Sequence, residues 1–311
     1  MSTTTVPQAR ERAPLPTQGR RIPEQYWGYV LLAPAVLLVL GLILYPVAYS
    51  FWLSFHSKHA FLPIETFIGF ENYIELFTNS EDFWRSIELG AIYAFGSVGL
   101  QLIVGVSAAL LLNQTFVGRT FIRGVTLFPY MVPTVVVVIL FRWLFNDAYG
   151  FFPYALDLLG LDRDAFLWME PEHVMLTVIL ISTWTFFPFV VIGTLARLQT
   201  IDPELYAAAK VDGAGVFRRF IHVTLPQISS VLFVIVLLRF IFMFTKFDVI
   251  WLLTGASGLG YFVRTLPIYT FVVTFNQLQV GAGAALSVIM FMLLAGFAYV
   301  YFKLFRREEN L

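Results

Sequence analysis

Six apolar stretches of the chain are each long enough to cross a bilayer as a helix. A helix spans the hydrocarbon core with about 20 predominantly apolar residues, because it satisfies its own backbone N–H and C=O groups. The pattern therefore predicts an all-α, polytopic membrane protein with six transmembrane helices. The stretches are approximately 26–55, 89–113, 124–145, 174–196, 229–253 and 284–302.

Composition agrees with this pattern. Hydrophobic residues make up 59% of the 311 positions and charged residues only 13%, against about 25% charged residues in soluble domains. Lys plus Arg and Asp plus Glu number 20 each, so the net charge indicates no nucleic-acid partner. The chain has no cysteine, which excludes disulfides and thiolate metal sites.

The cations of the interspan loops lie mostly on one side. That side carries 13 of them, in the N-terminus, the 114–123 and 197–228 loops and the C-terminal tail, whereas the opposite loops carry only Lys58, Arg85, Arg163 and Arg264. Because cytoplasmic loops are enriched in Lys and Arg, both termini are predicted to be cytoplasmic. We expect residues 1–25 to be a disordered cytoplasmic tail and residues 26–311 to form the membrane domain. The first apolar run is far too long for the core of a signal peptide.

A polar segment, 202–226, separates the fourth and fifth stretches and predicts two short helices joined by a turn. Asp202 suits the N-cap and Pro203 the first helical position. Alanines 207–209 extend this first helix, and Gly213 is a natural residue to end it. A second helix is expected from Gly215 to Pro226. We name residues 202–226 the elbow.

The alanine row argues for a protein partner rather than for lipid. An interspan loop can be an amphipathic helix that rests on the membrane surface. Ala207, Ala208 and Ala209 would offer lipid little apolar area, however, but would allow another protein to approach the backbone closely.

The elbow sequence "YAAAKVDGAGVFRRFIHVTLP" resembles the cytoplasmic coupling motif of binding-protein-dependent ABC importer permeases, with Ala207 where the motif has glutamate. The resemblance extends to "LAPAVLLVLGLILYPVAYSFWLSF", "FIGFENYIELF", "FTKFDVIWLLTGASG" and "GAGAALSVIM", and it is closest to carbohydrate-type permeases, specifically the first member of each permease pair. The resemblance assigns ATPase docking to residues of the elbow. These are Ala207, Ala208, Ala209, Asp212, Gly213, Ala214, Phe220 and Pro226.

The resemblance also implies the partners. The membrane domain would be one permease of a heterodimer in the bacterial or archaeal inner membrane, above two ATP-binding subunits and fed by an extracytoplasmic solute-binding protein. ATP and Mg²⁺ would bind to the ATP-binding subunits, so this chain is expected to need no cofactor and not to be an enzyme. Its cargo would be a sugar or oligosaccharide. Glycerol-phosphate, a polyamine or another small solute is the alternative cargo, and a self-sufficient carrier or channel is the alternative class.

Motifs of other chemistries are incomplete. None of the four lysines lies in a Gly-Lys-Ser/Thr sequence, so a P-loop is absent. "GASG" would need a later histidine to form an intramembrane protease, but none follows His222. The four histidines form no His-Glu-x-x-His pair that predicts zinc. "GAGAA" at 281–285 lacks the third glycine of a dinucleotide fingerprint and is better explained by close helix packing.

Ionisable and aromatic residues within the spans are candidates for the translocation path. A charge at the centre of a bilayer costs about 2.5–3.5 kcal/mol on insertion scales, so such residues usually face protein or water. Arg239 and Lys246 are seven residues apart and are expected to share a helix face, with Asp248 pointing elsewhere. Trp184 and Trp251 could stack on a sugar ring, although packing is the simpler explanation for each.

Overall fold

The computed structural model describes residues 24–161, 167–255 and 258–308. Contacts divide the chain into two units, with the boundary between Tyr49 and Ser50. The predicted N-terminal tail falls outside the described residues up to position 23 and stays a prediction.

The first unit contains most of the first predicted membrane helix. α1 (Glu24–Val39) continues through a π-helical turn (Leu40–Leu44) into α2 (Tyr45–Leu53), and the apolar helix has 27 residues from Trp27 to Leu53. In the π turn the amide of Tyr45 donates to the carbonyl of Leu40, five residues back. Pro46 follows directly, and its ring would clash with the carbonyl four residues back in a regular α-helix. The wider turn relieves this clash, so the helix continues past the proline.

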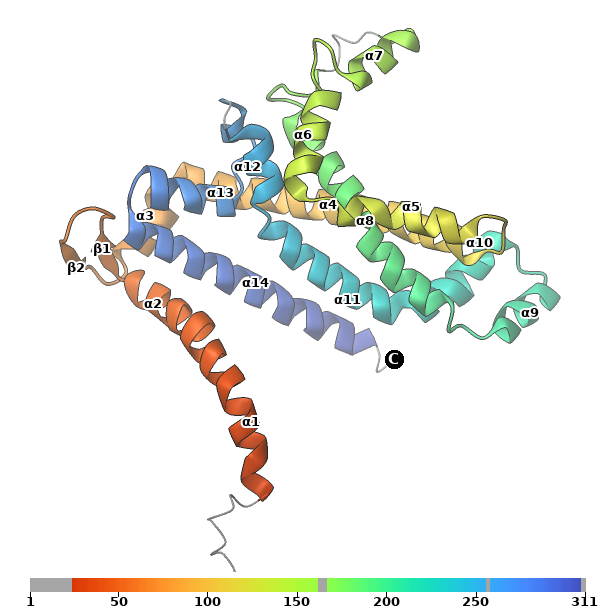
Figure 1. Ribbon diagram of the computed structural model, residues 1–311, viewed down its shortest axis with the longest axis horizontal. Coiled ribbons are helices and arrows are strands. Elements are labelled where there is room, and N and C mark those ends of the chain that lie inside the picture. Colours follow the sequence, from red (N-terminus) through yellow and green to blue (C-terminus); the bar gives the residue numbers. More distant parts are fainter. Residues whose placement is uncertain (1–23, 162–166, 256–257, 309–311) are drawn as a thin grey trace, which may run out of the picture. The chain divides into compact units, whose positions relative to one another are not determined.

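Three long helices form the centre of the second unit. α4 (Glu81–Asn113), α8 (Val174–Leu198) and α11 (Leu225–Phe244) contact one another, and α14 (Val280–Glu308) packs against α11 (Figure 1). The core between them is apolar, and its largest fully buried side chains include Phe83, Tyr93 and Ile181. The lengths and composition of these helices confirm the all-α membrane fold predicted from the apolar pattern.

The third predicted span is not one straight helix. α5 (Arg119–Met131) and α6 (Thr134–Leu144) meet at a bend of 96°. Val132, which precedes Pro133, has the extended conformation that proline imposes on its predecessor. Among the described residues, five helices are long and apolar enough to cross a membrane, or six if this bent pair is one span.

The fifth span is longer than predicted because it begins in the elbow. α10 (Val216–Arg219), a π turn (Phe220–Thr224) and α11 follow one another directly, and α12 (Asp248–Thr254) comes after a break at residues 245–247. The prediction that the elbow's second helix ends at Pro226 is therefore wrong. The amide of Leu225 donates to the carbonyl of Phe220, five residues back, so the turn before Pro226 is widened as it is before Pro46.

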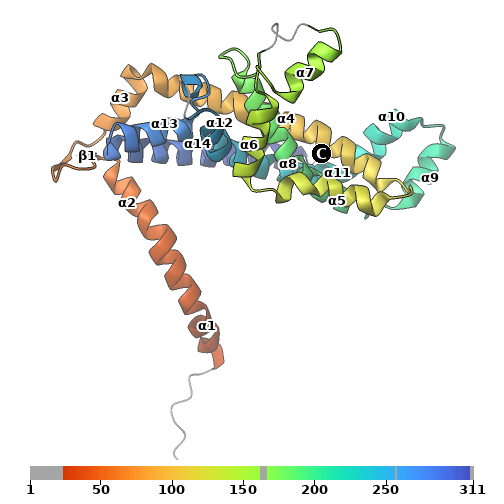
Figure 2. The same cartoon turned by 45° about the horizontal axis from the view of Figure 1, so that its top comes forward.

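Short elements occupy the two ends of the second unit (Figures 1 and 2). At one end, a ribbon of β1 (His56–Lys58) and β2 (Glu65–Phe67) pairs antiparallel, an element that the sequence did not predict. The amide of Asn72 fastens the ribbon by donating to the carbonyls of Ser54 and His56, at 2.8 and 3.1 Å. The elbow lies at the opposite end. The remaining elements are α3 (Glu71–Asn79), α7 (Phe151–Leu158), α9 (Pro203–Val211), a 3-10 turn (Gly258–Tyr261), α13 (Leu266–Phe271) and a π turn (Val272–Asn276).

The close helix packing predicted for "GAGAA" is confirmed at Gly283, where an added Cβ would overlap Thr274 of the π turn at Val272–Asn276, and α14 packs equally closely on the ribbon. A Cβ added at Gly281 would overlap the backbone carbonyl of His56 in β1, which has no rotamer with which to move away. Only glycine allows α14 to begin this close to the ribbon.

Gly281→Ala should therefore lower the free energy of unfolding by about 1–3 kcal/mol through overpacking. Gly296→Ala is the matched control in the same helix, because an added Cβ there meets nothing within 4 Å. The control should be neutral or stabilising, by up to about 1 kcal/mol. Thermal unfolding of the purified chain in detergent measures both, and equal midpoints for the two variants would contradict the packing argument.

Candidate functional site

The elbow starts as its sequence predicts. The Oδ1 atom of Asp202 accepts a hydrogen bond from the amide of Glu204 at 2.9 Å, and Pro203 occupies the first turn of α9. The cap satisfies one of the free amides at the helix N-terminus. The N-cap prediction is confirmed.

The turn of the elbow depends on Gly213. This residue has a φ of +74°, which confirms the predicted left-handed conformation. The following amide, of Ala214, donates to the carbonyl of Ala209 at 2.9 Å, and the amide of Gly213 donates to Lys210 at 3.0 Å. This pattern closes the C-terminus of α9 and sends the chain into α10.

The predicted docking residues are largely accessible in the single chain. The three alanines form a surface of small side chains on α9. The other predicted residues lie in the turn and in the helix that follows it. Ala207, Ala208, Asp212, Gly213 and Pro226 are exposed, and Ala209, Ala214 and Phe220 are half-buried. The arrangement leaves the backbone of α9 open to close approach by another protein.

One hydrogen bond braces the elbow internally, and another joins the two long helices at its base. The hydroxyls of Tyr206 and Thr224 are 3.1 Å apart and connect α9 to the π turn. Arg197, near the end of α8, donates from Nε to the carbonyl of Gln227 at 2.8 Å, which connects α8 to the start of α11. These contacts favour movement of the elbow together with α11.

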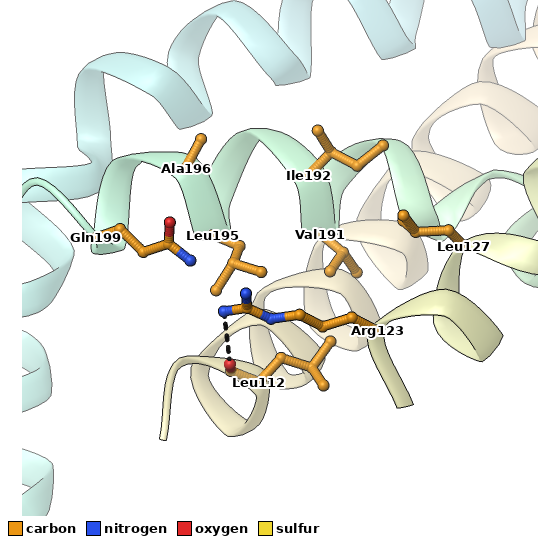
Figure 3. A pocket seen from close by; sticks show the side chains of 8 residues that line it. All are labelled: Leu112, Arg123, Leu127, Val191, Ile192, Leu195, Ala196 and Gln199. Atoms are coloured by element: carbon orange, nitrogen blue, oxygen red, sulfur yellow. Dashed lines mark hydrogen bonds between the residues drawn. The ribbon is translucent and has the colours of Figure 1, made fainter. Parts of the chain in front are cut away.

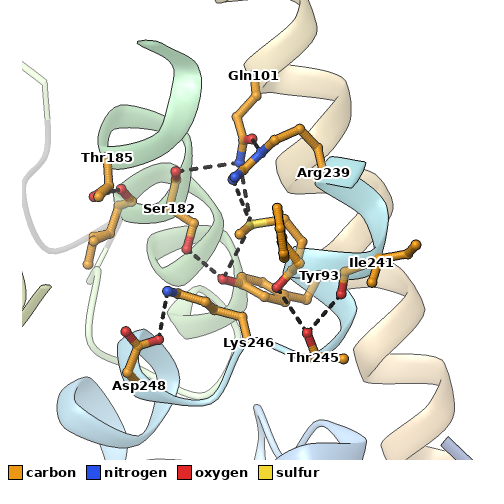
Figure 4. A network of polar contacts seen from close by, with 12 residues as sticks. Tyr93, Gln101, Ser182, Thr185, Arg239, Ile241, Thr245, Lys246 and Asp248 are labelled. Carbon is orange, nitrogen blue, oxygen red and sulfur yellow. Dashed lines mark hydrogen bonds and ion pairs between the residues drawn. The ribbon is translucent and has the colours of Figure 1, made fainter. Parts of the chain in front are cut away.

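A second candidate site is a polar cluster buried between α4, α8 and α11 (Figure 4). Arg239 is only 2% exposed. Its Nε donates to Oε1 of Gln101 at 2.8 Å, and its guanidinium carbon lies 4.9 and 5.6 Å from the ring centres of Phe186 and Phe189. Within the described residues no carboxylate lies at ion-pair distance from Arg239. The charge is held by one amide and by aromatic faces, an arrangement that favours a cation in a dry site.

Two further groups complete this cluster. The hydroxyl of Tyr93 lies 2.7 Å from that of Ser182, and Nε2 of Gln101 lies 3.5 Å from the carbonyl of Ser182. Tyr93 and Gln101 are fully buried. Arg239 therefore joins three helices and does not line an open path in this conformation.

Lys246 and Asp248 lie beside the cluster, where they form an ion pair of 3.0 Å. The prediction that Asp248 points away is wrong, because α11 ends at Phe244 and the helical repeat no longer applies. Lys246 also lies 4.5 Å from the ring centre of Phe186, so it does approach the surroundings of Arg239 as expected. The side chains of Lys246 and Asp248 are 20% and 41% exposed and remain candidates for a solute path.

The two candidate tryptophans belong to aromatic packing clusters. Trp184 meets Phe141 edge-on at 5.1 Å between ring centres. Trp251 lies 5.5 Å from Phe247 and 4.7 Å from Phe271. Both arrangements fit packing, and a role in the path stays a prediction.

Sequence reasoning missed the neutral members of the cluster. Tyr93, Ser97 and Gln101 follow one another at spacings of four on α4, which places them on one face of the helix. This stripe of polar positions within an apolar helix was the available signal. Among the described residues, no group of His, Cys, Asp and Glu could hold a metal ion.

Fold and site together define a helical membrane protein with a capped, accessible elbow between two of its long helices. Residues 101–308 match the family described as "Binding-protein-dependent transport system inner membrane component", and the chain belongs to this family of ABC importer permeases.

Relatives match nearly end to end. The chain is 35% identical over 283 residues to the trehalose/maltose transport system permease protein MalF of Thermococcus litoralis, covering 90% of this chain and 95% of that one. It is also 35% identical to the sulfoquinovosyl glycerol transport system permease protein SmoG of Agrobacterium fabrum, with 90% of each chain covered. A chain of a bacterial ABC transporter involved in import of the acidic polysaccharide alginate has the same fold, with a TM-score of 0.79 at 23% identity over 91% of this chain and 96% of that one.

The buried cluster predicts an unequal response to two substitutions. Gln101→Leu removes the acceptor of a buried guanidinium and should cost about 2–3 kcal/mol of unfolding free energy. Arg239→Met in the same background removes the charge as well and should recover part of that loss, because apolar replacement of a buried polar pair is often neutral. Thermal unfolding midpoints of the two single variants and the double variant measure the coupling. A double variant less stable than Gln101→Leu would contradict the assignment.

Proposed function

We propose that this chain is a membrane subunit of an ABC importer that carries a sugar or oligosaccharide into the cytoplasm, with ATP hydrolysis on separate subunits. The elbow is the main observation behind this proposal. Its alanine face is accessible, as a surface that docks an ATPase must be. The relatives that bear the names of trehalose/maltose and sulfoquinovosyl glycerol transport support the cargo class.

Docking would place α9 in a cleft of the ATPase. Ala207 and Ala208 are exposed and add almost no bulk, so the ATPase can contact the backbone of α9 directly. Closure of two ATP-binding subunits, with ATP and Mg²⁺ between them, would then displace both α9 and α10. Since α10 continues into α11, the displacement reaches the helices that surround the polar cluster. Coupling of this kind requires one element on which both sites act, and the joined elbow and α11 supply it.

The orientation follows from charge. We place the elbow and both termini on the cytoplasmic face, since the loops on that side hold most of the cations. The ribbon lies at the opposite end of the second unit and would face an extracytoplasmic solute-binding protein. A related alginate transporter has been solved with a periplasmic protein that carries an alginate pentasaccharide, which supports such a partner here.

A second permease would complete the translocation path. Large apolar side chains are exposed on α5 and α6, including Phe121, Phe128 and Ile139. In a bilayer these faces can meet lipid or a partner permease, as in the proposed heterodimer.

The accessible charges beside the cluster favour a neutral, hydroxyl-rich cargo over the alternatives, because Arg239, unpaired among the described residues, is buried and out of a solute's reach. Lys246 and Asp248 neutralise each other while each keeps part of its side chain accessible, so the pair offers donors and acceptors without net charge. A polyamine or glycerol-phosphate path would benefit from an excess of one sign. Binding of candidate solutes to the cognate solute-binding protein separates these cargoes.

The orientation can be tested with single cysteines, since the native chain has none. Asn79 lies beside the ribbon end and Thr200 precedes the elbow, and both are exposed. In intact cells an impermeant maleimide should label Asn79→Cys at once and Thr200→Cys only after permeabilisation. The reverse order of labelling would place the elbow outside and exclude ATPase docking.

The elbow can be tested at its turn. Gly213→Val forces a β-branched residue into a positive-φ position, at a cost of about 1–2 kcal/mol or more, and should misdirect α10. Gly213→Asn is the matched control, because asparagine tolerates this conformation. In the assembled transporter the valine variant should lose solute uptake and co-purify less ATPase, while expression and membrane insertion stay normal. Full uptake and full ATPase retention by Gly213→Val would reduce the elbow to a surface helix.

A further inference from the structure

Two arginines converge on one backbone oxygen at the end of α4. Nε of Arg119 and Nη2 of Arg123 donate to the carbonyl of Leu112 at 2.8 and 3.1 Å. Leu112 lies in the last turn of α4, where helix carbonyls lack intrahelical partners and the dipole attracts cations. The carbonyl oxygen has two lone pairs and can accept both bonds, which gathers two guanidinium charges at one helix end.

The pair lacks a counter-charge. In the part of the chain that the structure describes, no carboxylate lies within ion-pair distance of either arginine. Two cations that share one acceptor lie close together and repel each other. Nε of Arg123 is moreover buried without a hydrogen-bond partner. The site holds two positive charges and one unused donor, and an anion would complement both.

A cavity adjoins Arg123, the second arginine of this pair (Figure 3). It has a volume of about 250 Å³ and lies between the end of α4, α5 and α8. Its polar groups, Arg123 and Gln199, lie toward the elbow end of these helices, and its walls are otherwise apolar. Ile192 forms part of the wall and is 49% exposed, so the cavity is accessible from outside the helices on that side.

Polar and apolar groups are ordered along the helix axes. On α8, Val191 and Ile192 lie about 10–12 Å farther from the elbow along the helix axis than Gln199, given the helical rise. On α5, Leu127 lies about 6 Å farther along the helix axis than Arg123. A ligand that fills the cavity would meet donors at the membrane surface and hydrocarbon below them, which is the order of groups in a phospholipid.

We propose that this cavity binds an anionic phospholipid, with the phosphate at Arg123, beside the charge of Arg119, and an acyl chain along Leu127 and Ile192. The leaflet rests on the orientation proposed above, which makes it the cytoplasmic one. Anionic lipids are attracted to basic pockets between helices on that side. Because Gln199 is followed within four residues by α9, the bound lipid would brace α5 against α8 where α8 leads into the elbow.

The test is lipid retention by the purified full-length chain, measured by native mass spectrometry after titration with palmitoyl-oleoyl phosphatidylglycerol or phosphatidylcholine. Wild type should retain phosphatidylglycerol preferentially. Arg123→Gln should weaken that binding about tenfold, the scale of one charge-assisted hydrogen bond. Because Arg119 still bonds Leu112 in this variant, the end of α4 should stay capped. Lys303→Gln is the matched control, an exposed cation on the same predicted face outside the cavity, and should bind like wild type.

Two further arms distinguish the source of the anion. Ile192→Asn should weaken phosphatidylglycerol binding through the acyl groove, and soluble glycerol 3-phosphate should fail to displace the lipid. Equal retention of phosphatidylglycerol by wild type and Arg123→Gln would overturn the proposal. Displacement of the lipid by glycerol 3-phosphate would also overturn it, because it would indicate a site for a soluble phosphate. Loss of the lipid when the second permease is bound would assign the face to the permease interface instead. None of these measurements involves transport, so they can fail without affecting the proposed importer, and the importer can fail without affecting them.

Discussion

Every backbone amide and carbonyl that enters the hydrocarbon must find its partner within the protein, and the course of the chain at Pro46, Pro133 and Pro226 depends on how that demand is met. A proline removes one donor and displaces one carbonyl. Before Pro46 and before Pro226 the chain inserts a π turn, whose five-residue bond leaves room for the ring. At Pro133 it breaks instead, and α5 and α6 meet at 96°. The first solution preserves a spanning helix, and the second redirects the chain.

Local chemistry allowed the first helix and the turn of the elbow to be predicted in detail. Asp202, Pro203 and Gly213 act through bonds to residues at most a few positions away, so their roles can be read from sequence alone. The long apolar helices were equally predictable, because the bilayer sets their minimum length. The two-stranded ribbon was missed, since strands of three residues that depend on Asn72 and on α14 for support leave little periodicity in the sequence.

The outcome at a proline could not be predicted. Pro133 lies within an apolar stretch and Pro226 at the end of the elbow, and the helix breaks at the first and continues through the second. At Pro226 the π turn is joined to α9 by the contact between Tyr206 and Thr224, a tertiary contact that the local sequence does not reveal. The pairing of Lys246 with Asp248 was missed for a related reason, because the end of α11 at Phe244 invalidates the helical repeat used to place them.

The buried cluster shows a further limit of prediction from sequence. Gln101 carries no charge, although it supplies the acceptor for Arg239. Pairing of a buried polar group with one defined partner disfavours other alignments of three otherwise apolar helices, which is a means of fixing their register.

The π turn at Phe220–Thr224 also sets the angular phase of the elbow. Each α-helical residue advances the chain by about 100°, and the turn contains one residue more than the regular helix needs. The side chains of α10 are therefore rotated by about that angle, relative to α11, from where an uninterrupted helix would place them. Removal of a single residue from this turn would swing Val216 and Phe217 around the axis by more than a quarter of a revolution while leaving every side chain chemically unchanged. The number of residues in this turn, rather than the identity of any contact, therefore sets the direction in which the side chains of α10 point.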